Sequence, residues 1–200
     1  MSKYLIEVKN IKKNFVHKNG LIKLFENVNI KVKQGELIAL VGPSGSGKST
    51  FLHMLGLLDK PTNGNIIIAG LDSRKINDKQ KDEIKRRNIS MIFQNNNLLS
   101  DFTALENILM PLIIRGEKYS HSEAKAESIL KTIRMLDRKN HFPSELSGGE
   151  QQRVAIARSL ISETNLILAD EPTGNLDFKT SKEIFSYLLR LKKMNKAIIF

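Results

Sequence analysis

The segment Gly42-Pro-Ser-Gly-Ser-Gly-Lys-Ser49 combines three glycines with a lysine and a hydroxyl-bearing serine. It fits the pattern GxxxxGK[ST], which predicts a loop that binds the phosphates of a nucleotide. Glycines let backbone amides curl around the β-phosphate, and a following helix adds the positive end of its dipole. Lys48 would contact the β- and γ-phosphate oxygens, and the Ser49 hydroxyl would ligate Mg²⁺. The predicted nucleotide-binding residues here are Gly42, Pro43, Ser44, Gly45, Ser46, Gly47, Lys48, Ser49 and Thr50.

Two acids follow an apolar run further along the chain, where Asn165 to Ala169 leads into Asp170 and Glu171. In a phosphate-loop fold, a strand of this kind places its first acid near the metal. We therefore expect Asp170 to bind Mg²⁺ and Glu171 to polarise the water that attacks the γ-phosphate. Paired acids at a strand end are also common as solvated caps, so this interpretation depends on the phosphate loop.

The segment Leu146-Ser-Gly-Gly-Glu150-Gln has the form of a helix start, with Ser147 as N-cap and Glu150 completing a capping box. Capping does not explain Gly148 and Gly149, each of which costs roughly 1 kcal/mol of helix propensity. The glycines are expected if bare backbone amides must approach an anion. Because the chain already has a phosphate loop, this segment predicts a nucleotide held between two copies in a head-to-tail dimer. The residues assigned to this second contact are Ser147, Gly148, Gly149 and Glu150.

Alternating strand and helix patterns surround these motifs. Strand patterns at 5–11 and 28–32 are separated by Asn19-Gly20, a tight-turn pair, and predict an antiparallel β portion. A continuous apolar run at 36–41 predicts a buried strand before the phosphate loop. The rhythm then continues with predicted helices at 45–58, 78–87, 150–161 and 180–195, and predicted strands at 66–69, 89–93, 165–169 and from 197. The fold class predicted is α/β, with a mostly parallel sheet in a single domain over 1–200.

Residues from about 98 to 145 have a different, helical character. Thr103-x-x-Glu106 and Ser120-x-x-Glu123 predict two capping boxes ahead of apolar periodicity. Ile129, Ile133 and Leu136 would share one face of the second helix. We interpret this segment as a helical subdomain inserted into the α/β core.

Composition excludes several classes of protein. The absence of cysteine excludes thiol catalysis and disulfides. The longest apolar run, Ile108 to Ile114, is far shorter than the roughly 20 residues of a membrane-spanning helix. The net charge of +11 is compatible with nucleic acid or an anionic membrane as partner. The more direct explanation is solvated lysines, because the chain is also rich in Ile and Asn, as AT-rich codons would produce. The charge alone therefore does not identify a partner.

The phosphate loop, the LSGGEQ segment and the ADEP segment, in this order, resemble the nucleotide-binding subunits of ATP-binding-cassette transporters over essentially the whole chain. The resemblance implies an ATPase that uses ATP and Mg²⁺, forms a homodimer and drives transmembrane permease subunits. It also implies that Gln94 senses Mg²⁺ and the γ-phosphate, and that Gly174-Asn-Leu-Asp177 crosses the dimer interface. Phe15 sits where the family stacks an aromatic ring on adenine, although a core aromatic is the alternative.

A finer resemblance connects Asp170 to Asp177 with the branch of lipoprotein-releasing, macrolide-export and cell-division ATPases. The segments 57–61, 101–107 and 110–112 look most like the lipoprotein-releasing type. This implies a motor at the cytoplasmic face of a bacterial inner membrane that powers lipoprotein release, with the other two members of the branch as alternatives. A cytosolic helix of the permease would dock on the region 98–111, unless the same side chains form the subdomain's own core. The candidate contacts are Leu98, Leu99, Phe102, Leu109 and Met110.

A soluble cassette that acts on nucleic acid is the remaining alternative. Such relatives carry a long coiled coil or two joined cassettes, whereas the interval from Gln94 to Leu146 is short and without heptads. The family also carries a switch histidine soon after the strand that begins near Ala197, and the chain stops at Phe200. None of the four histidines follows the Asp170 strand, so we expect the natural sequence to continue. These histidines are His17, His53, His121 and His141.

Overall fold

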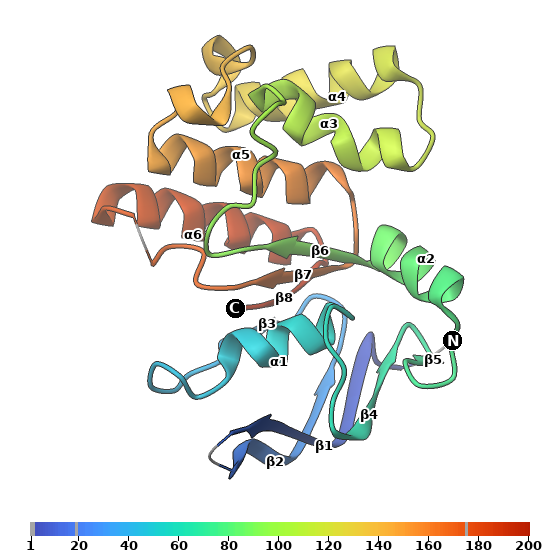
Figure 1. Ribbon diagram of the computed structural model, residues 1–200. Coiled ribbons are helices and arrows are strands. Elements are labelled where there is room, and N and C mark those ends of the chain that lie inside the picture. Colours follow the sequence, from blue (N-terminus) through green and yellow to red (C-terminus); the bar gives the residue numbers. More distant parts are fainter. Residues whose placement is uncertain (1–2, 19, 175) are drawn as a thin grey trace.

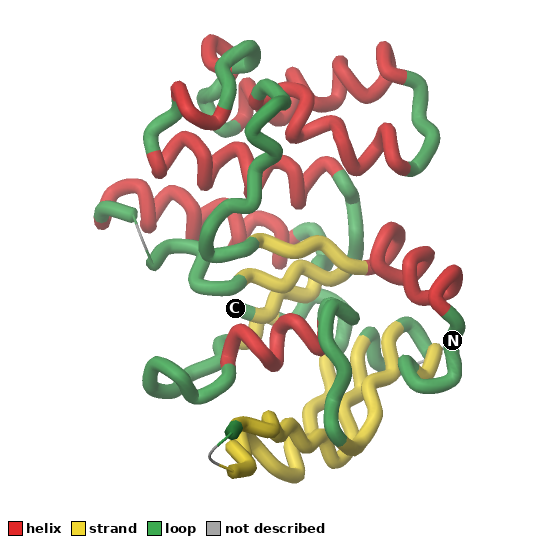
Figure 2. Tube along the Cα trace, in the orientation of Figure 1, coloured by secondary structure: helices red, strands yellow, loops and turns green. Residues whose placement is uncertain are grey.

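Two four-stranded sheets organise the part of the chain that the computed structural model describes, residues 3–18, 20–174 and 176–200. One sheet is antiparallel with the strand order β2-β1-β4-β5. The other is parallel with the order β3-β8-β7-β6. Figure 1 shows the helices around these sheets, and Figure 2 shows that the strands gather in the lower half and the longer helices in the upper half. The predicted α/β class, with an antiparallel N-terminal portion and a parallel sheet, is confirmed.

The antiparallel sheet is built on one long hairpin, β1 (Ile6–His17) with β2 (Gly20–Val32). The predicted strands at 5–11 and 28–32 are therefore the inner ends of longer strands. Asn19, in the predicted turn, lies outside the described residues, but the pairing of His17 with Gly20 closes the hairpin there. The other two strands of this sheet are β4 (Asn63–Ile68) and β5 (Leu71–Asp72).

Loops that contain predicted site residues follow strands of the parallel sheet. Its strands are β3 (Leu37–Ile38), β6 (Ile89–Ile92), β7 (Leu166–Ala169) and β8 (Ala197–Ile199). The strand predicted over 36–41 is regular only at its centre. Its hydrogen bonding nevertheless continues, because the Leu40 amide donates to the Phe200 carbonyl at 2.6 Å before the chain turns into the phosphate loop.

Helix α1 (Lys48–Leu55) lies between the two sheets. Its buried side chains, Phe51, Leu52, Met54 and Leu55, join one core cluster with residues of β1, β4, β7 and β8. The opposite face of the parallel sheet is covered by α5 (Gly148–Ile161) and α6 (Phe178–Lys193), which form a second cluster with Ile167 and Ile198. Helix α2 (Asp78–Asn88) precedes β6 at the edge of this sheet.

The helical region contains α3 (Ala104–Ile114) and α4 (Tyr119–Thr132), followed by short 3₁₀ turns at Leu136–Arg138 and Pro143–Glu145. It has a core of its own, which it shares with one face of α5. The predicted capping box of Thr103 and Glu106 is confirmed. The predicted box of Ser120 and Glu123 is wrong, because α4 begins two residues earlier, at Tyr119, with Lys118 as N-cap and no side-chain cap.

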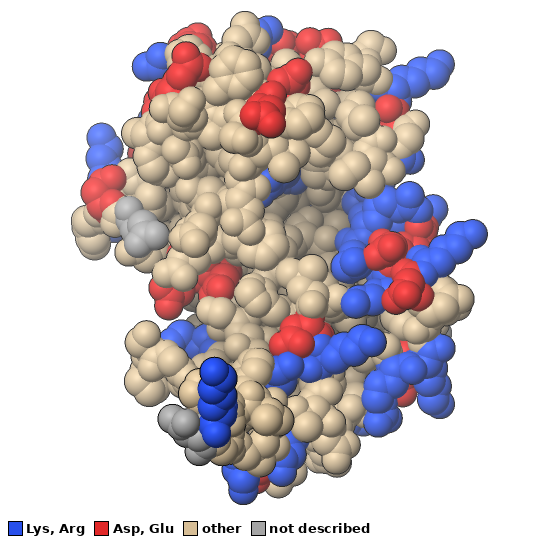
Figure 3. All heavy atoms as spheres, viewed as in Figure 1, with Lys and Arg blue, Asp and Glu red and all other residues tan. Residues whose placement is uncertain are grey.

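The apolar face predicted for α4 is only partly correct. Ile133 is 1% exposed, but the helix ends at Thr132, so the chain turns before Leu136, which is 37% exposed. None of the described helices is both long and apolar enough to cross a bilayer. The lysines and arginines concentrate over α2 and the antiparallel sheet on the face shown in Figure 3.

Candidate functional site

The predicted phosphate loop joins β3 to α1 and has the backbone that its glycines were expected to supply. Gly45 and Gly47 have φ angles of 79° and 93°, in the left-handed region that favours glycine. A Cβ on Gly47 would lie 2.6 Å from Leu24 Cδ2, so this position also lacks room for a side chain. Helix α1 begins at Lys48 with no side-chain cap and no acid in its first turn. Its amides and its dipole are therefore available to an anion.

The Lys48 side chain bends back over this loop. Its Nζ donates to the carbonyl oxygens of Gly42 at 2.9 Å and Pro43 at 3.1 Å. These bonds hold a positive charge at the mouth of the loop, where the amides of α1 also point. The arrangement fits the phosphates of a nucleotide.

Ser49 and Asp170 come from different elements and meet. The Ser49 Oγ, in the first turn of α1, donates to Asp170 Oδ1 at 3.0 Å. Asp170 directly follows β7 and is 6% exposed, and its amide donates to Ile92 at the end of β6. A hydroxyl and a carboxylate within one hydrogen bond are the hard oxygen donors that Mg²⁺ prefers. The two predicted metal ligands are therefore close enough to share an ion.

Gln94 and Glu171 form the second pair. Gln94 follows β6, Glu171 follows Asp170, and the Gln94 Nε2 donates to Glu171 Oε2 at 3.0 Å. Glu171 has a φ of 44°, which is rare for a residue with a side chain and is a form of strain concentrated at functional sites. The Gly174 amide donates to the Glu171 carbonyl at 3.0 Å and closes the turn. The exposed Glu171 carboxylate is thus fixed beside the third predicted metal ligand.

The start of α5 contains the predicted capping box. The Ser147 amide donates to Glu150 Oε2 at 2.8 Å, and the Glu150 amide donates to Ser147 Oγ at 3.3 Å. The Ser147 backbone bond, aided by Arg138, holds the pKa of Glu150 below its usual value. A Cβ on Gly148 would meet nothing within 4 Å, and one on Gly149 would only touch Thr180 at 3.6 Å. The packing of the chain itself therefore does not require glycine at either position.

The two glycine-bearing helix starts lie on opposite faces of the parallel sheet, since α1 packs on one face and α5 on the other. Asp177, in the loop expected to cross a dimer interface, caps α6 by accepting hydrogen bonds from the amides of Lys179 and Thr180. The hydrogen bond from the Thr180 hydroxyl, together with these backbone bonds, lowers the pKa of Asp177. Asn175, in the same loop, lies outside the described residues.

Phe15 lies near the end of β1 with 42% of its surface exposed, so the core-aromatic alternative is wrong. The Lys13 ammonium lies 4.9 Å from the centre of its ring and covers part of it. An exposed aromatic ring at a strand end is compatible with stacking on a base.

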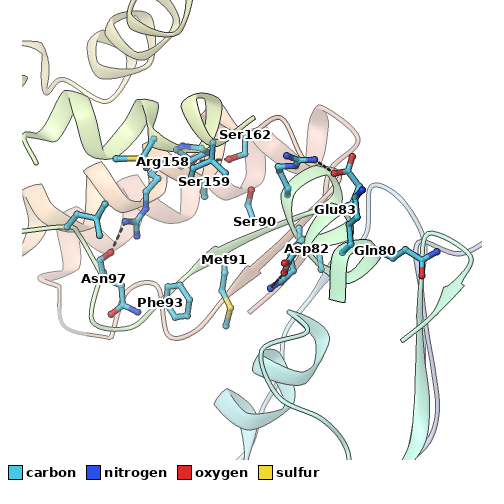
Figure 4. A pocket seen from close by; sticks show the side chains of 18 residues that line it. Gln80, Asp82, Glu83, Ser90, Met91, Phe93, Asn97, Arg158, Ser159 and Ser162 are labelled. Atoms are coloured by element: carbon cyan, nitrogen blue, oxygen red, sulfur yellow. Dashed lines mark hydrogen bonds and ion pairs between the residues drawn. The ribbon is translucent and has the colours of Figure 1, made fainter. Parts of the chain in front are cut away.

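A groove of about 1240 Å³ runs between α2, β6, α3 and α5. Figure 3 shows the hollow beside the basic surface of α2, and Figure 4 shows its lining. Of the predicted contacts in 98–111, Leu99 and Met110 line this groove. Leu109 is 2% exposed and belongs to the helical core, so the core alternative holds for that residue. Leu98 packs against the same core, while Phe102 is 37% exposed outside the groove lining.

Arg158, on α5, is a residue that the sequence reasoning missed. Its guanidinium lines the groove and donates to the carbonyls of Asn96 and Asn97, just after Gln94. A single charged residue inside the apolar run from Val154 to Leu160 was the available indication.

Comparison with known proteins agrees with this geometry. A family model described as "ABC transporter" matches residues 25–174. Two dimeric structures of the ATP-binding cassette MJ0796, one in a post-hydrolysis state with ADP and Pi bound, superpose with a TM-score of 0.91 at 39% identity. Each comparison covers 97% of this chain and 86% of the other. The chain therefore belongs to the ABC transporter family, and its fold is that of the ATP-binding cassette.

Within that family, the chain is similar to lipoprotein-releasing system ATP-binding proteins named LolD. It is 47% identical over 201 residues to the protein of Rickettsia bellii and 42% identical over 200 residues to that of Legionella pneumophila strain Paris. Both alignments cover 100% of this chain and 88% of the relative. The predicted resemblance to the lipoprotein-releasing branch is thus confirmed.

Proposed function

We propose that this chain is the ATP-hydrolysing motor subunit of a transporter that releases lipoproteins from a bacterial inner membrane. The observation that carries the proposal is the convergence of four side chains, from α1 and from the ends of β6 and β7, in two hydrogen-bonded pairs beside the Lys48 loop. These pairs are Ser49 with Asp170 and Gln94 with Glu171. The similarity to LolD proteins at 41–47% identity supports the cargo and the cytoplasmic face of the membrane as the site of action.

Each residue of the site has a distinct task in hydrolysis. Lys48 and the amides at the start of α1 would bind the β- and γ-phosphates of ATP, and Phe15 would stack on adenine. Ser49, Asp170 and Gln94 would hold Mg²⁺, which supplies neutralisation of the phosphate charge. Glu171 would accept a hydrogen bond from the attacking water and so orient it toward the γ-phosphate. Gln94 already contacts Glu171, so it can orient that carboxylate as well as ligate the metal.

A second copy would complete each site. The exposed start of α5 lies on the opposite face of the sheet from the chain's own phosphate loop, so one copy is not expected to bring both to one nucleotide. In a head-to-tail dimer, Ser147, Gly148 and Gly149 would approach the γ-phosphate bound by the partner. The open space at Gly148 supports this assignment, and Glu150 would brace the segment through its capping box.

The groove between α2, β6, α3 and α5 would receive a cytosolic helix of the transmembrane partner. Its apolar lining includes Met91, Leu99 and Met110, and charged residues of α2 border it. We assign the helical region of residues 98–145 to a subdomain that transmits this contact. No nucleic-acid partner is proposed, because the similarity is to transporter ATPases and the interval from Gln94 to Leu146 lacks a long coiled coil.

Replacement of Glu171 by Gln tests the reaction assignment. The amide keeps the shape of the side chain but removes the charge that orients water, so we expect nucleotide affinity to stay and hydrolysis to fall by at least about a hundredfold. Size-exclusion chromatography should then show an ATP-dependent dimer, and Lys48→Ala is the matched control that should bind no nucleotide. If Glu171→Gln hydrolyses ATP at the wild-type rate, the carboxylate is not the catalytic group.

Affinity capture of the Glu171→Gln protein with Mg-ATP from detergent-solubilised source membranes tests the cargo. Mass spectrometry should identify a transmembrane protein with a large extracytoplasmic domain of the lipoprotein-releasing type. Capture of a different membrane protein would retain the ATPase and overturn the cargo.

A further inference from the structure

The guanidinium of Arg158 holds the segment that follows Gln94. Its Nη1 donates to the Asn97 carbonyl and its Nη2 donates to the Asn96 carbonyl, both at 2.7 Å. Figure 4 shows the side chain reaching from α5 across the groove to Asn97. A planar guanidinium can engage two carbonyls at once, which a lysine ammonium on a single flexible stem does with poorer geometry.

No carboxylate in the described ranges is ion-paired with Arg158. Burial lowers the pKa of this guanidinium, and no neighbouring charge contributes to the shift. By contrast Arg153, five residues earlier on α5, pairs with Glu183 of α6 at 3.1 Å. Withdrawing a cation from water without a counter-ion is unfavourable, so its two charge-assisted bonds to the chain must offset that penalty.

The carbonyls that Arg158 binds belong to a strained turn. Asn96 and Asn97 have φ angles of 59° and 45°, two consecutive left-handed residues that are not glycine. Asparagine tolerates this region better than most residues, and the amides of Asn96 and Asn97 also donate within the turn, to the carbonyls of Phe93 and Asn95. The two arginine bonds hold the carbonyls of this turn from outside. Further along, the buried Asn107 holds the same segment through its side-chain bonds to the amide and carbonyl of Leu99. The connection after Gln94 is thus fixed at two points, by α5 and by α3.

We propose that Arg158 is a positioning residue for Gln94: its two bonds impose the left-handed turn at 96–97 that presents the Gln94 amide to Glu171. The proposal rests on the catalytic role assigned to Gln94 above. Because Arg158 also lines the groove, a partner segment bound in the groove would contact the same side chain. Groove occupancy and the alignment of the catalytic carboxylate would then be linked through one side chain.

A double-mutant cycle in ATP hydrolysis tests the proposal. Arg158→Met removes both donors and keeps an unbranched apolar side chain. We expect kcat to fall about tenfold with KM for ATP unchanged, since the phosphate loop is untouched. If Arg158 acts through Gln94, Arg158→Met should cause no further loss in a Gln94→Ala background. A second loss of equal size in that background would overturn the proposal.

Arg153→Met is the matched control, because it removes an arginine from the same helix that pairs with α6 instead of the turn. Any effect it has on kcat should be the same with Gln94 and with Ala at position 94. Arg158→Lys should recover part of the activity, because the charge remains but the two-carbonyl geometry does not. Thermal unfolding of every variant separates loss of fold from loss of position.

Amide hydrogen exchange tests the positioning without hydrolysis. In Arg158→Met, peptides that cover 95–99 should exchange faster, while peptides of β7 should exchange at the wild-type rate. Unchanged exchange at 95–99 would overturn the proposal even if the variant were inactive. If the wild type itself hydrolyses no ATP, the proposed function fails, and the exchange result still decides whether Arg158 holds the turn.

Discussion

Helices α1 and α5 both begin with glycines, but the two starts differ in what makes glycine necessary. At α1, Gly47 is left-handed and a side chain there would overlap Leu24, and no side chain caps the helix. At α5, Ser147 and Glu150 form a complete capping box, and Gly148 has open space around it. The glycine of α1 is required by the fold, whereas no contact among the described residues requires those of α5. The proposed approach of a partner's nucleotide would account for them.

Of the substitutions at the two helix starts, Gly47→Ala should have the largest effect on stability. The left-handed backbone and the overlap with Leu24 together should lower the free energy of unfolding by about 2 to 4 kcal/mol. ATP affinity should fall in parallel, because relief of the overlap moves the start of α1. Urea unfolding and equilibrium nucleotide binding measure the two effects. A fully stable variant with wild-type affinity would contradict the packing described at this glycine.

Gly148→Ala should leave the fold stable and impair hydrolysis. Its backbone is not left-handed, so alanine should raise the free energy of unfolding by about 0.5 kcal/mol. Nucleotide binding to the monomer should not change. Hydrolysis should fall at least about tenfold, because the added methyl group overpacks the approach of the partner's nucleotide. Dimerisation with Mg-ATP, followed by light scattering, gives the decisive readout: a wild-type dimer would place the contact elsewhere.

The smallest expected effect is a pH dependence of stability that the start of α5 has and the start of α1 lacks. The Ser147 bonds hold the pKa of Glu150 below its ordinary value of 4.5, so its stabilisation is complete above that value. It is lost as pH falls through the lowered folded-state pKa. Glu150→Gln should cost about 0.5 kcal/mol at neutral pH, and that difference should shrink as pH falls below 4.5 and through the lowered folded-state pKa. Urea unfolding across this range measures it. Helix α1 has no acid in its first turn and offers no equivalent.

The sequence predicted the elements whose local chemistry is self-contained. The box of Thr103 and Glu106 satisfied the first turn of α3 as expected. The box of Ser120 and Glu123 failed, because α4 begins at Tyr119 and already includes Ser120. The pairs Ser49 with Asp170 and Gln94 with Glu171 were anticipated as shared roles, but their contacts depend on strand order, which no local pattern encodes.

Tertiary contacts explain what the sequence could not supply. The left-handed turn at Asn96 and Asn97 is bound through both carbonyls by Arg158, which lies over 60 residues away in the chain. Leu109 and Leu99 are both leucines of one segment, yet one is buried in the helical core and the other lines the groove. Periodicity could not separate them, because Leu99 lies in the loop before α3, where no helical period applies, while Leu109 is one of many apolar residues of α3.

The position of α1 between the two sheets has a thermodynamic consequence. The helix that presents Lys48 and Ser49 to a nucleotide also supplies Phe51, Leu52, Met54 and Leu55 to the core that joins both sheets. Unfolding of that core therefore removes the ligand site as well. A nucleotide that binds only the folded chain adds about 2.7 kcal/mol to its stability at a hundredfold excess over Kd. The melting temperature of this protein should therefore rise with ATP concentration, so the chain should be more resistant to heat when ATP is abundant.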